Sequence, residues 1–174
     1  QGADELLFMD SVASLYGRNN VGEIIAKLSK DIFIPITVGG GIRSVKDALN
    51  MFKSGADKIS INTAAIDEPK LVKELSNEFG SQSLVISIEA KKIREKKWVA
   101  YKHNGRDSSN LDVVEWAKKT VDNGAGEVLL TSIDNEGLNT GLDFDLFKEV
   151  SKNITVPVIL GGGLGSLKDV TSAK

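Results

Sequence analysis

Two glycine-rich loops are the stretches of this chain best suited to chemistry. The first spans residues 34–44 and the second residues 156–166, and each has three consecutive glycines between an apolar run and a serine. Glycines let the backbone approach an anion closely, and the first N–H groups of a helix add hydrogen-bond donors at the positive end of the helix dipole. The pattern predicts two phosphate-binding loops. For either loop alone, a tight strand-to-helix turn without a ligand is the alternative.

The two loops belong to a repeat that covers most of the chain. An offset of 122 residues aligns Ile34 with Val156. The same offset pairs glycines, acidic residues and apolar residues of the two halves, namely Gly39 with Gly161, Gly41 with Gly163, Asp47 with Asp169, Glu5 with Glu127 and Leu7 with Leu129. A register that holds over this length indicates an internal duplication. Two related phosphate loops imply a substrate with a phosphate at each end.

Strand-like and helix-like segments alternate along the chain. Apolar strands are predicted at 6–9, before Gly39, and at 58–61, 84–88, 126–131 and 155–160. Helices are predicted between them at 21–30, 45–53, 69–79, 111–123 and 142–151. Apolar strands separated by helices favour a parallel sheet. Several βα units in a row, with polar residues at the strand ends, favour a (β/α)8 barrel over an open doubly wound sheet.

The repeat also predicts how much of the barrel is present. With the same offset, the counterpart of the strand near residue 84 falls before residue 1, and that of the strand near residue 58 falls after residue 174. We therefore expect residues 1–174 to form a single α/β domain, a (β/α)8 TIM barrel of the two-fold repeated, phosphate-binding type, with about six βα units and without its first and last strands. Unpaired strands at both edges would favour self-association.

Composition and charge exclude several classes of protein. The net charge is −2 with lysines and arginines scattered, which gives no basic patch for nucleic acid. The chain has no cysteine, so neither a disulfide framework nor a thiolate metal site is expected. No apolar run approaches the roughly 18 residues that span a bilayer, and the first residues do not read as a signal peptide. We expect a cytoplasmic protein with no metal, cofactor, nucleic acid or membrane partner.

Carboxylates are predicted at several strand ends, where barrel enzymes place their active sites. Asp10 follows the first strand, Glu89 ends the fourth, and Glu136 lies in the loop after the fifth. Such groups can serve as general acids and bases. A solvated loop charge or a helix cap is the alternative for each of them. Glu89 is the strongest candidate because it directly follows an apolar strand.

The charged segment 91–105 predicts an exposed hairpin or a lid. Trp98 and Tyr101 alternate along it and are expected to pack within the hairpin. His103 is the only histidine of the chain, and in its polar surroundings we expect a surface residue and not a base. Trp116 is expected in the packing of a helix against the barrel.

These motifs together resemble the cyclase subunit of imidazole glycerol phosphate synthase, the HisF family of histidine biosynthesis. The resemblance covers essentially the entire chain and rests on VGGGIRS at 38–44, GADKISINTAA at 55–65, FGSQ at 79–82 and GAGEVLLTSID at 124–134. It implies a two-fold repeated barrel that uses a bisphosphorylated ribulosyl aminoimidazole carboxamide nucleotide (PRFAR). It also implies a heterodimer with a glutaminase subunit of the HisH type, which delivers the ammonia. The products would be imidazole glycerol phosphate and the nucleotide AICAR.

The resemblance also implies roles for individual residues. One substrate phosphate would be held by Gly41, Asn62 and Thr63, and the other by Gly137 and Gly163. Charged residues that ring the entrance of an ammonia channel are matched by Glu5, Lys58 and Glu127. Asp57 matches a residue that docks the glutaminase. Asp10 matches an acid at the end of the family's second strand.

Glu89 is the main departure from the family pattern. It stands where the family has one of two catalytic aspartates; the other would lie upstream of Gln1, so the chain alone is expected to be inactive. A glutamate moves the carboxylate outward by about one methylene, and a displacement of about 1 Å can cost roughly a hundredfold in rate. Val12, Glu136 and Gly161 are further departures, all at the catalytic mouth. They favour a second reading, a HisF-like subunit that channels ammonia for amidation of a surface-polysaccharide sugar.

Overall fold

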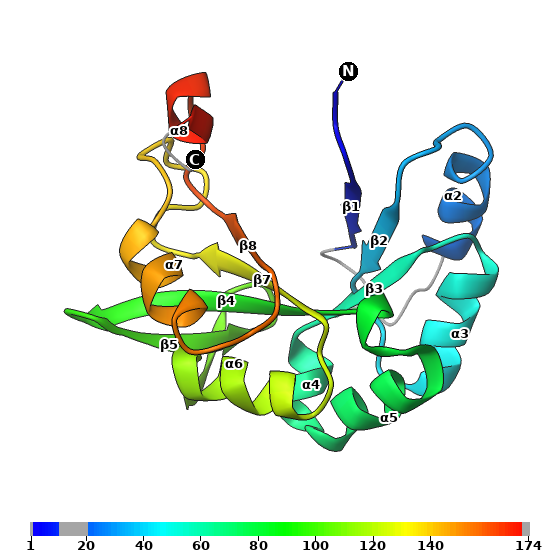
Figure 1. Ribbon diagram of the computed structural model, residues 1–174, viewed down its shortest axis with the longest axis horizontal. Coiled ribbons are helices and arrows are strands. Elements are labelled where there is room, and N and C mark those ends of the chain that lie inside the picture. The colour runs from blue at the N-terminus through cyan, green and yellow to red at the C-terminus, as the bar shows by residue number, and fades with distance from the viewer. Residues whose placement is uncertain (1, 11–20, 172–174) are drawn as a thin grey trace. The chain divides into compact units, whose positions relative to one another are not determined.

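The computed structural model describes residues 2–10 and 21–171, in which helices and strands alternate (Figure 1). Val12 therefore lies outside the described residues. The strands form one sheet with the order β1-β2-β3-β4-β5-β6, and β7 pairs with β4 and with β8. Contacts divide the chain into two compact units, Gln1–Ile86 with Asn123–Gly126, and Ser87–Asp122 with Glu127–Lys174. The alternation and the parallel pairings confirm the predicted class, a partial (β/α)8 barrel.

The first unit contains a parallel ladder of strands and the helices that connect them. Its strands are β1 (Leu6–Met9), β2 (Ile36–Gly39), β3 (Lys58–Ile61) and the start of β4 (Leu84–Arg94). Its helices are α2 (Val21–Leu28), α3 (Val45–Lys53), α4 (Thr63–Asp67) and α5 (Lys70–Phe79), followed by the 3-10 turn η1 (Ser81–Ser83). All four residues of β2 are buried, as expected for a strand covered on both faces.

The core of the first unit forms between the strands and an apolar stripe on each helix. Ile25 of α2, Ala48 of α3 and Leu75 of α5 are fully buried. Neighbouring helices also pack on one another: the rings of Phe52 and Phe79 lie with their centroids 4.7 Å apart. Helical spacing of apolar residues places one face of each helix against the sheet. The helices therefore fix the positions of the strands that they cover.

The second unit contains an antiparallel extension that the sequence predicts only in part. β4 pairs antiparallel with β5 (Lys97–Lys102), and β5 pairs with β6 (Asp107–Asp112). The prediction that the fourth strand stops at Glu89 is wrong, because β4 continues to Arg94. The reason is the ladder with β5, in which Glu89 lies opposite Tyr101. The expected hairpin is confirmed, and Trp98 is buried within it.

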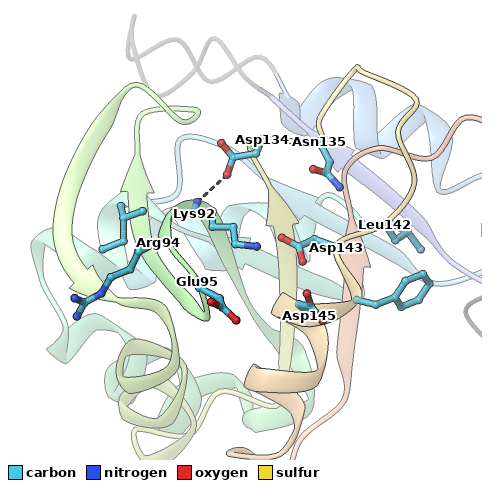
Figure 2. A pocket seen from close by; sticks show the side chains of 10 residues that line it. Lys92, Arg94, Glu95, Asp134, Asn135, Leu142, Asp143 and Asp145 are labelled. Atoms are coloured by element: carbon cyan, nitrogen blue, oxygen red, sulfur yellow. Dashed lines mark hydrogen bonds between the residues drawn. The ribbon is translucent and has the colours of Figure 1, made fainter.

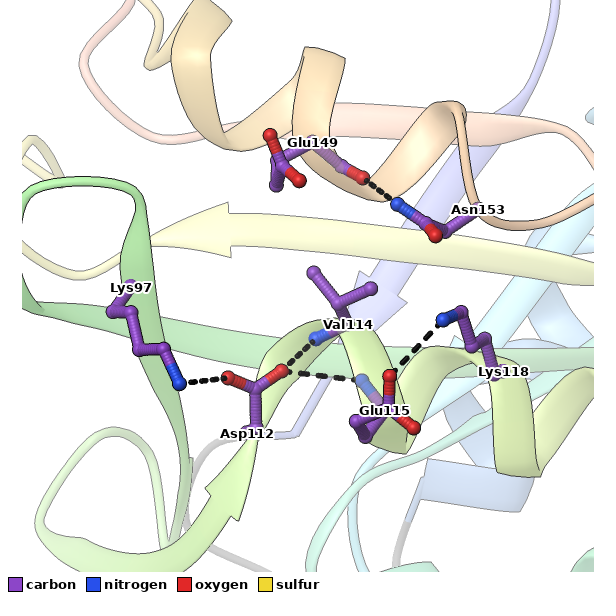
Figure 3. Close-up of polar contacts among 7 residues, drawn as sticks. All are labelled: Lys97, Asp112, Val114, Glu115, Lys118, Glu149 and Asn153. Atoms are coloured by element: carbon purple, nitrogen blue, oxygen red, sulfur yellow. Dashed lines mark hydrogen bonds and ion pairs between the residues drawn. The ribbon is translucent and has the colours of Figure 1, made fainter.

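The rest of the second unit consists of α6 (Val113–Asp122), β7 (Glu127–Ser132), α7 (Phe144–Ser151), β8 (Val158–Gly161) and α8 (Leu167–Thr171). The helix predicted from residue 111 begins at Val113 because Asp112 caps it: its Oδ1 accepts from the backbone N–H of Val114 at 3.0 Å and of Glu115 at 3.2 Å (Figure 3). Asp112 Oδ2 also lies 4.0 Å from Lys97 Nζ, which ties β5 to this helix start.

The strands at the ends of the ladders carry exposed apolar side chains. β1 pairs with β2 and presents Leu7 and Met9, which are 42% and 43% exposed. β8 pairs with β7 and presents Ile159, which is 41% exposed. Both strands are therefore suited to further pairing. In the part of the chain that the structure describes, no helix has the length and apolar character needed to cross a membrane.

Trp98 fastens the hairpin to α7, and replacing it by phenylalanine should destabilise the protein. Its Nε1 donates to Asp143 Oδ2 at 3.2 Å, while Asp143 Oδ1 caps α7 by accepting from the N–H of Leu146 at 3.0 Å. Losing the indole donor leaves a partly buried carboxylate oxygen without this bond, which costs about 1–2 kcal/mol. Urea unfolding followed by circular dichroism measures the change.

Trp116 offers a matched control for this substitution. It is as deeply buried as Trp98, and each indole has a lysine ammonium within 6 Å of its ring centroid. Its Nε1, however, has no hydrogen-bond partner among the described residues. Trp116→Phe thus removes the same volume without breaking a bond. Equal losses of stability in the two variants would contradict a role for the Trp98–Asp143 contact.

Candidate functional site

The first glycine loop is packed directly against the residue that follows β1. The N–H of Asp10 donates to Gly39 O at 2.9 Å. Gly40 has φ +96°, and a Cβ there would lie 2.2 Å from Asp10 O. Only glycine allows the loop and the end of β1 to approach so closely. The structure therefore places the predicted acid Asp10 beside the predicted phosphate loop.

Asn62 and Thr63 lie at the neighbouring strand end. In the parallel pairing of β2 with β3, Gly39 lies opposite Ser60. Two residues further along both strands, Gly41 and Asn62 therefore leave the sheet on the same side. Asn62 is the N-cap residue of α4, and Thr63 is its first residue; both are half-buried. The three residues predicted to hold one phosphate are thus brought to one edge of the sheet.

In both halves, an aspartate in the first turn of the helix after the glycine loop accepts hydrogen bonds from the residues just before that helix. In the first half, Asp47 Oδ2 accepts from the N–H of Arg43 at 3.1 Å and from Ser44 Oγ at 2.8 Å. In the second half, Asp169 Oδ2 accepts from the N–H groups of Gly165 at 3.1 Å and of Ser166 at 2.8 Å. Several donors expected for phosphate are thus already used within the chain. The glycine loops themselves are left as the better anion sites.

Hydrogen bonds to Asp169 also change its pKa. The backbone N–H groups of Gly165 and Ser166, with the Ser166 hydroxyl, hold the pKa of Asp169 below its ordinary value. This carboxylate therefore stays ionised through the pH range in which phosphate esters lose their second proton.

The second glycine loop is fixed by the segment that precedes α7. The N–H of Gly141 donates to Gly163 O at 2.8 Å, and Asn135 Nδ2 donates to Gly141 O at 2.8 Å. Gly163 has φ +91°, and a Cβ there would lie 2.2 Å from Gly141 O. The turn at Gly163 therefore depends on the absence of a side chain.

Glu136 lies against this second loop, and Gly137 follows Glu136 in the chain. β7 and β8 pair so that Thr131 lies opposite Gly161, and the N–H of Glu136 then bonds to Ser132 O at 3.0 Å. The carboxylate of Glu136 is close to the loop, because a Cβ built on Gly162 would be 3.3 Å from its Oε2. Gly137 is exposed, with open space where a Cβ would be. Of the residues predicted here, Glu136 is thus placed beside the loop of Gly163, whereas a side chain at Gly137 would meet nothing within 4 Å.

Glu89 is engaged by a turn that sequence reasoning missed. Its half-buried carboxylate Oε2 accepts from the N–H of Gly105 at 2.7 Å, in the turn between β5 and β6. The adjacent residue Ala90 is bound by the N–H of Ile133, which follows β7, at 2.9 Å. The Asn104–Gly105 dipeptide is a turn signal that could have located this contact. His103 lies in the same turn, with Nδ1 at 2.7 Å from Asp107 Oδ2.

Two of the residues predicted at a channel entrance, Glu5 and Lys58, form a half-buried ion pair in the first unit. Lys58 Nζ lies 2.9 Å from Glu5 Oε2, and the Thr37 hydroxyl donates to Glu5 Oε1. Burial raises the pKa of Glu5, but the bonds from Thr37 and Lys58 outweigh it and leave the pKa below its ordinary value. Thr37, which is 2% exposed, was not predicted. Glu127 begins β7 of the second unit.

The lowered pKa of Glu5 predicts a stability difference that depends on pH. A carboxylate whose folded-state pKa is depressed stabilises the folded state above its unfolded pKa, and this stabilisation is lost as the pH falls through the folded pKa. Glu5→Gln should therefore lower the free energy of unfolding near about pH 7, and the difference from the parent should vanish below about pH 4. Urea titrations over this range measure it. Glu74→Gln, at an exposed position of α5, should show no such trend.

Asp57 has a structural contact of its own. Its Oδ2 accepts from the N–H of Ile36 at 2.8 Å, while its own N–H donates to Ile36 O at 2.9 Å. This reciprocal pair fixes the start of β2 against the start of β3. The predicted docking role of Asp57 is not needed to explain its position.

A cleft of about 720 Å³ opens in the second unit between the hairpin and the start of α7 (Figure 2). Its walls include Lys92 and Arg94 of the hairpin and Asp134, whose Oδ2 accepts from the N–H of Lys92 at 2.7 Å. None of the predicted catalytic or phosphate residues lines it. Within the described ranges, no group of histidine and acidic side chains is placed to hold a metal ion.

The comparisons with known proteins point to histidine biosynthesis. A family model described as histidine biosynthesis protein matches residues 1–174. The imidazole glycerol phosphate synthase subunit HisF of Legionella pneumophila is 53% identical over 169 residues, which are 97% of this chain and 80% of that protein. The subunit of the same name from Bacillus cereus (strain G9842) is 48% identical over 164 residues, 94% of this chain but 65% of that protein. The chain thus spans about two thirds of the Bacillus cereus relative.

Proposed function

Because this chain belongs to the histidine biosynthesis protein family, we propose that it is the cyclase subunit of an imidazole glycerol phosphate synthase. The substrate in this proposal is the bisphosphorylated ribulosyl aminoimidazole carboxamide nucleotide. Ammonia from a glutaminase partner adds to it, the imidazole ring closes, and AICAR leaves.

The repeated loop geometry is the observation that carries this proposal. At positions that the repeat relates, Gly40 and Gly162 both have a positive φ, and a Cβ would lie 2.2 Å from Asp10 O in the first loop and 2.7 Å from Ser132 O in the second. Each loop is followed by a helix whose first-turn aspartate accepts from the hydroxyl of the serine before it. Backbone N–H groups in such glycine turns form concave anion sites. Gly41 with Asn62 and Thr63 would hold one phosphate, and Gly137 with Gly163 the other.

Carboxylates beside these loops supply the acid and base groups. Glu89 is placed as the base, since its carboxylate is half-buried and is oriented by the N–H of Gly105. Asp10 and Glu136 each lie beside one glycine loop, where they can relay protons to and from a substrate fixed at its two ends. Holding both ends fixes the reacting atoms, which is worth several orders of magnitude in rate.

Ammonia would enter at the opposite ends of the strands, where Glu5 and Lys58 form their ion pair. Breaking that pair opens a path along the strand interiors, next to Thr37. Glu127 would complete the ring of charges, and a glutaminase of the HisH type would dock at this end, near Asp57. The chain spans 65% of the length of the Bacillus cereus relative.

A second candidate function is supported by Glu89. A glutamate in place of the family's aspartate changes the position of the carboxylate, while Glu5 and Lys58, which the resemblance assigns to a channel entrance, form an ion pair. This combination suits a HisF-like subunit that passes ammonia to another enzyme, which amidates a sugar of a surface polysaccharide.

Turnover with free ammonium separates the two functions. The full-length gene product is supplied with the bisphosphorylated nucleotide and excess ammonium, which makes the glutaminase unnecessary, and release of AICAR is followed. Turnover supports the cyclase. If no product forms while the protein is folded by circular dichroism, the cyclase proposal fails and the channelling function takes its place.

A further inference from the structure

We propose that the turn at residues 103–106, here called the β5–β6 turn, is a positioning element that holds the carboxylate of Glu89 for reaction, with Asn104 as the residue that sets its shape. The inference rests on the proposed function, because it takes Glu89 as the catalytic carboxylate. Asn104 itself is a positioning residue.

The backbone of the β5–β6 turn has an uncommon conformation. His103, Asn104 and Gly105 have φ values of +52°, +57° and +75°, three successive residues in the left-handed region. The N–H of Arg106 donates to Lys102 O at 3.1 Å and closes the turn. In this conformation the N–H of Gly105 is directed at Glu89 Oε2, at 2.7 Å. Unfavourable backbone geometry of this kind persists where the surroundings hold it, and it clusters at functional sites.

The turn is held from two sides of Glu89. On the strand side, Glu89 lies opposite Tyr101, two residues before the turn. On the other side, a Cβ built on Gly105 would be 3.4 Å from Ile133 Cδ1, and the N–H of Ile133 bonds to Ala90 O at 2.9 Å. Strand pairing fixes the backbone of Glu89 but leaves its side-chain torsions free. The rigid N–H of Gly105 therefore selects one position of the carboxylate.

Substitutions at Asn104 separate backbone shape from side-chain chemistry. Asn104→Val disfavours the left-handed conformation because the side chain is β-branched, whereas Asn104→Gly favours that conformation although it removes the whole side chain. In the ammonium-dependent reaction of the full-length protein, Asn104→Val should lower kcat by about tenfold to a hundredfold with KM within about twofold of the parent. Asn104→Gly should retain kcat within about twofold, because the backbone conformation is preserved.

Lys96 provides a matched control in the same hairpin. It lies in the turn between β4 and β5 with φ +53°, is exposed, and is far along the strand from Glu89. Lys96→Val carries the same backbone penalty and should leave kcat unchanged. If Asn104→Val does not fold, Asn104→Ala replaces it with a milder penalty. Hydrogen exchange of the Gly105 amide gives a second readout, which should accelerate in Glu89→Ala.

The outcomes distinguish a failure of the positioning role from a failure of the proposed cyclase function. Full kcat in a folded Asn104→Val protein, with an active parent, overturns the positioning role alone. An equal loss in Asn104→Gly, or in Lys96→Val, also overturns it, because the effect would not depend on the backbone at Gly105. An inactive parent contradicts the proposed function, and the catalytic role of the turn fails with it. Gly105 exchange that is unchanged in Glu89→Ala shows that the contact does not hold the turn.

Discussion

Glu89→Gln should reduce the ammonium-dependent kcat by about a hundredfold to ten-thousandfold with little change in KM, as expected for loss of a general base. Glutamine has nearly the same shape as glutamate, and its amide oxygen can still accept from the N–H of Gly105. The turn and the strands should therefore stay in place, and only the basicity is removed. Steady-state kinetics of AICAR release, with circular dichroism of both proteins, measures the effect.

Two further variants serve as comparisons for the loss of kcat in Glu89→Gln. Glu89→Asp introduces the residue type that the resemblance to the HisF family implies here, but it withdraws the carboxylate from Gly105 by about one methylene, so we expect a loss smaller than that of Glu89→Gln. Glu95→Gln, in the exposed tip of the same hairpin, should be neutral. Undiminished turnover in Glu89→Gln would exclude this carboxylate as the base and would move that role to Asp10 or Glu136.

Gly163→Ala should be the most destabilising single substitution in the second phosphate loop. Its Cβ would overlap Gly141 O at 2.2 Å, and its φ of +91° disfavours any side chain. Steric overlap with backbone adds to the backbone penalty, for a loss of about 3 kcal/mol or more in the free energy of unfolding. The bond from the N–H of Gly141 to Gly163 O would also be disturbed. KM for the bisphosphorylated nucleotide should rise in the protein that still folds.

Gly137→Ala is the matched control for this substitution. Gly137 also has a positive φ, +73°, but a Cβ there meets nothing within 4 Å. Its cost should be the backbone term alone, about 1–2 kcal/mol. Urea unfolding gives the two free energies, and substrate titration gives the two values of KM. Similar losses in both variants would show that the contact with Gly141 does not constrain the loop.

Local signals were sufficient to predict several elements to the residue. The strands 6–9 and 58–61 and the helix 45–53 have the bounds of β1, β3 and α3. The helix is delimited by the Ser44 cap and by an apolar stripe. β6 could not be predicted in this way, because its residues are polar and its existence depends on pairing with β5. Cross-strand pairing is decided by partners that are distant in the sequence.

The candidate site was predictable in its parts but not in its contacts. Glycines next to strand ends indicated where a backbone could approach an anion, and the structure packs Asp10 against Gly39 and Glu136 against Gly162. The bond from Gly105 to Glu89, in contrast, depends on the register of the hairpin. A polar segment gives no periodic signal for that register. The bond from Thr37 to Glu5 could not be predicted either, because in the sequence Thr37 is one more β-branched residue of a buried strand.

The first-turn aspartates of the helices after the two glycine loops also limit how tightly free anions can compete for the helix starts. Asp47 and Asp169 each lie three residues from the serine that they bind, so they act as tethered anions at an effective concentration in the millimolar range or above. Inorganic phosphate below that range does not displace them. We therefore expect these helices to begin at the same residues with and without inorganic phosphate below that concentration.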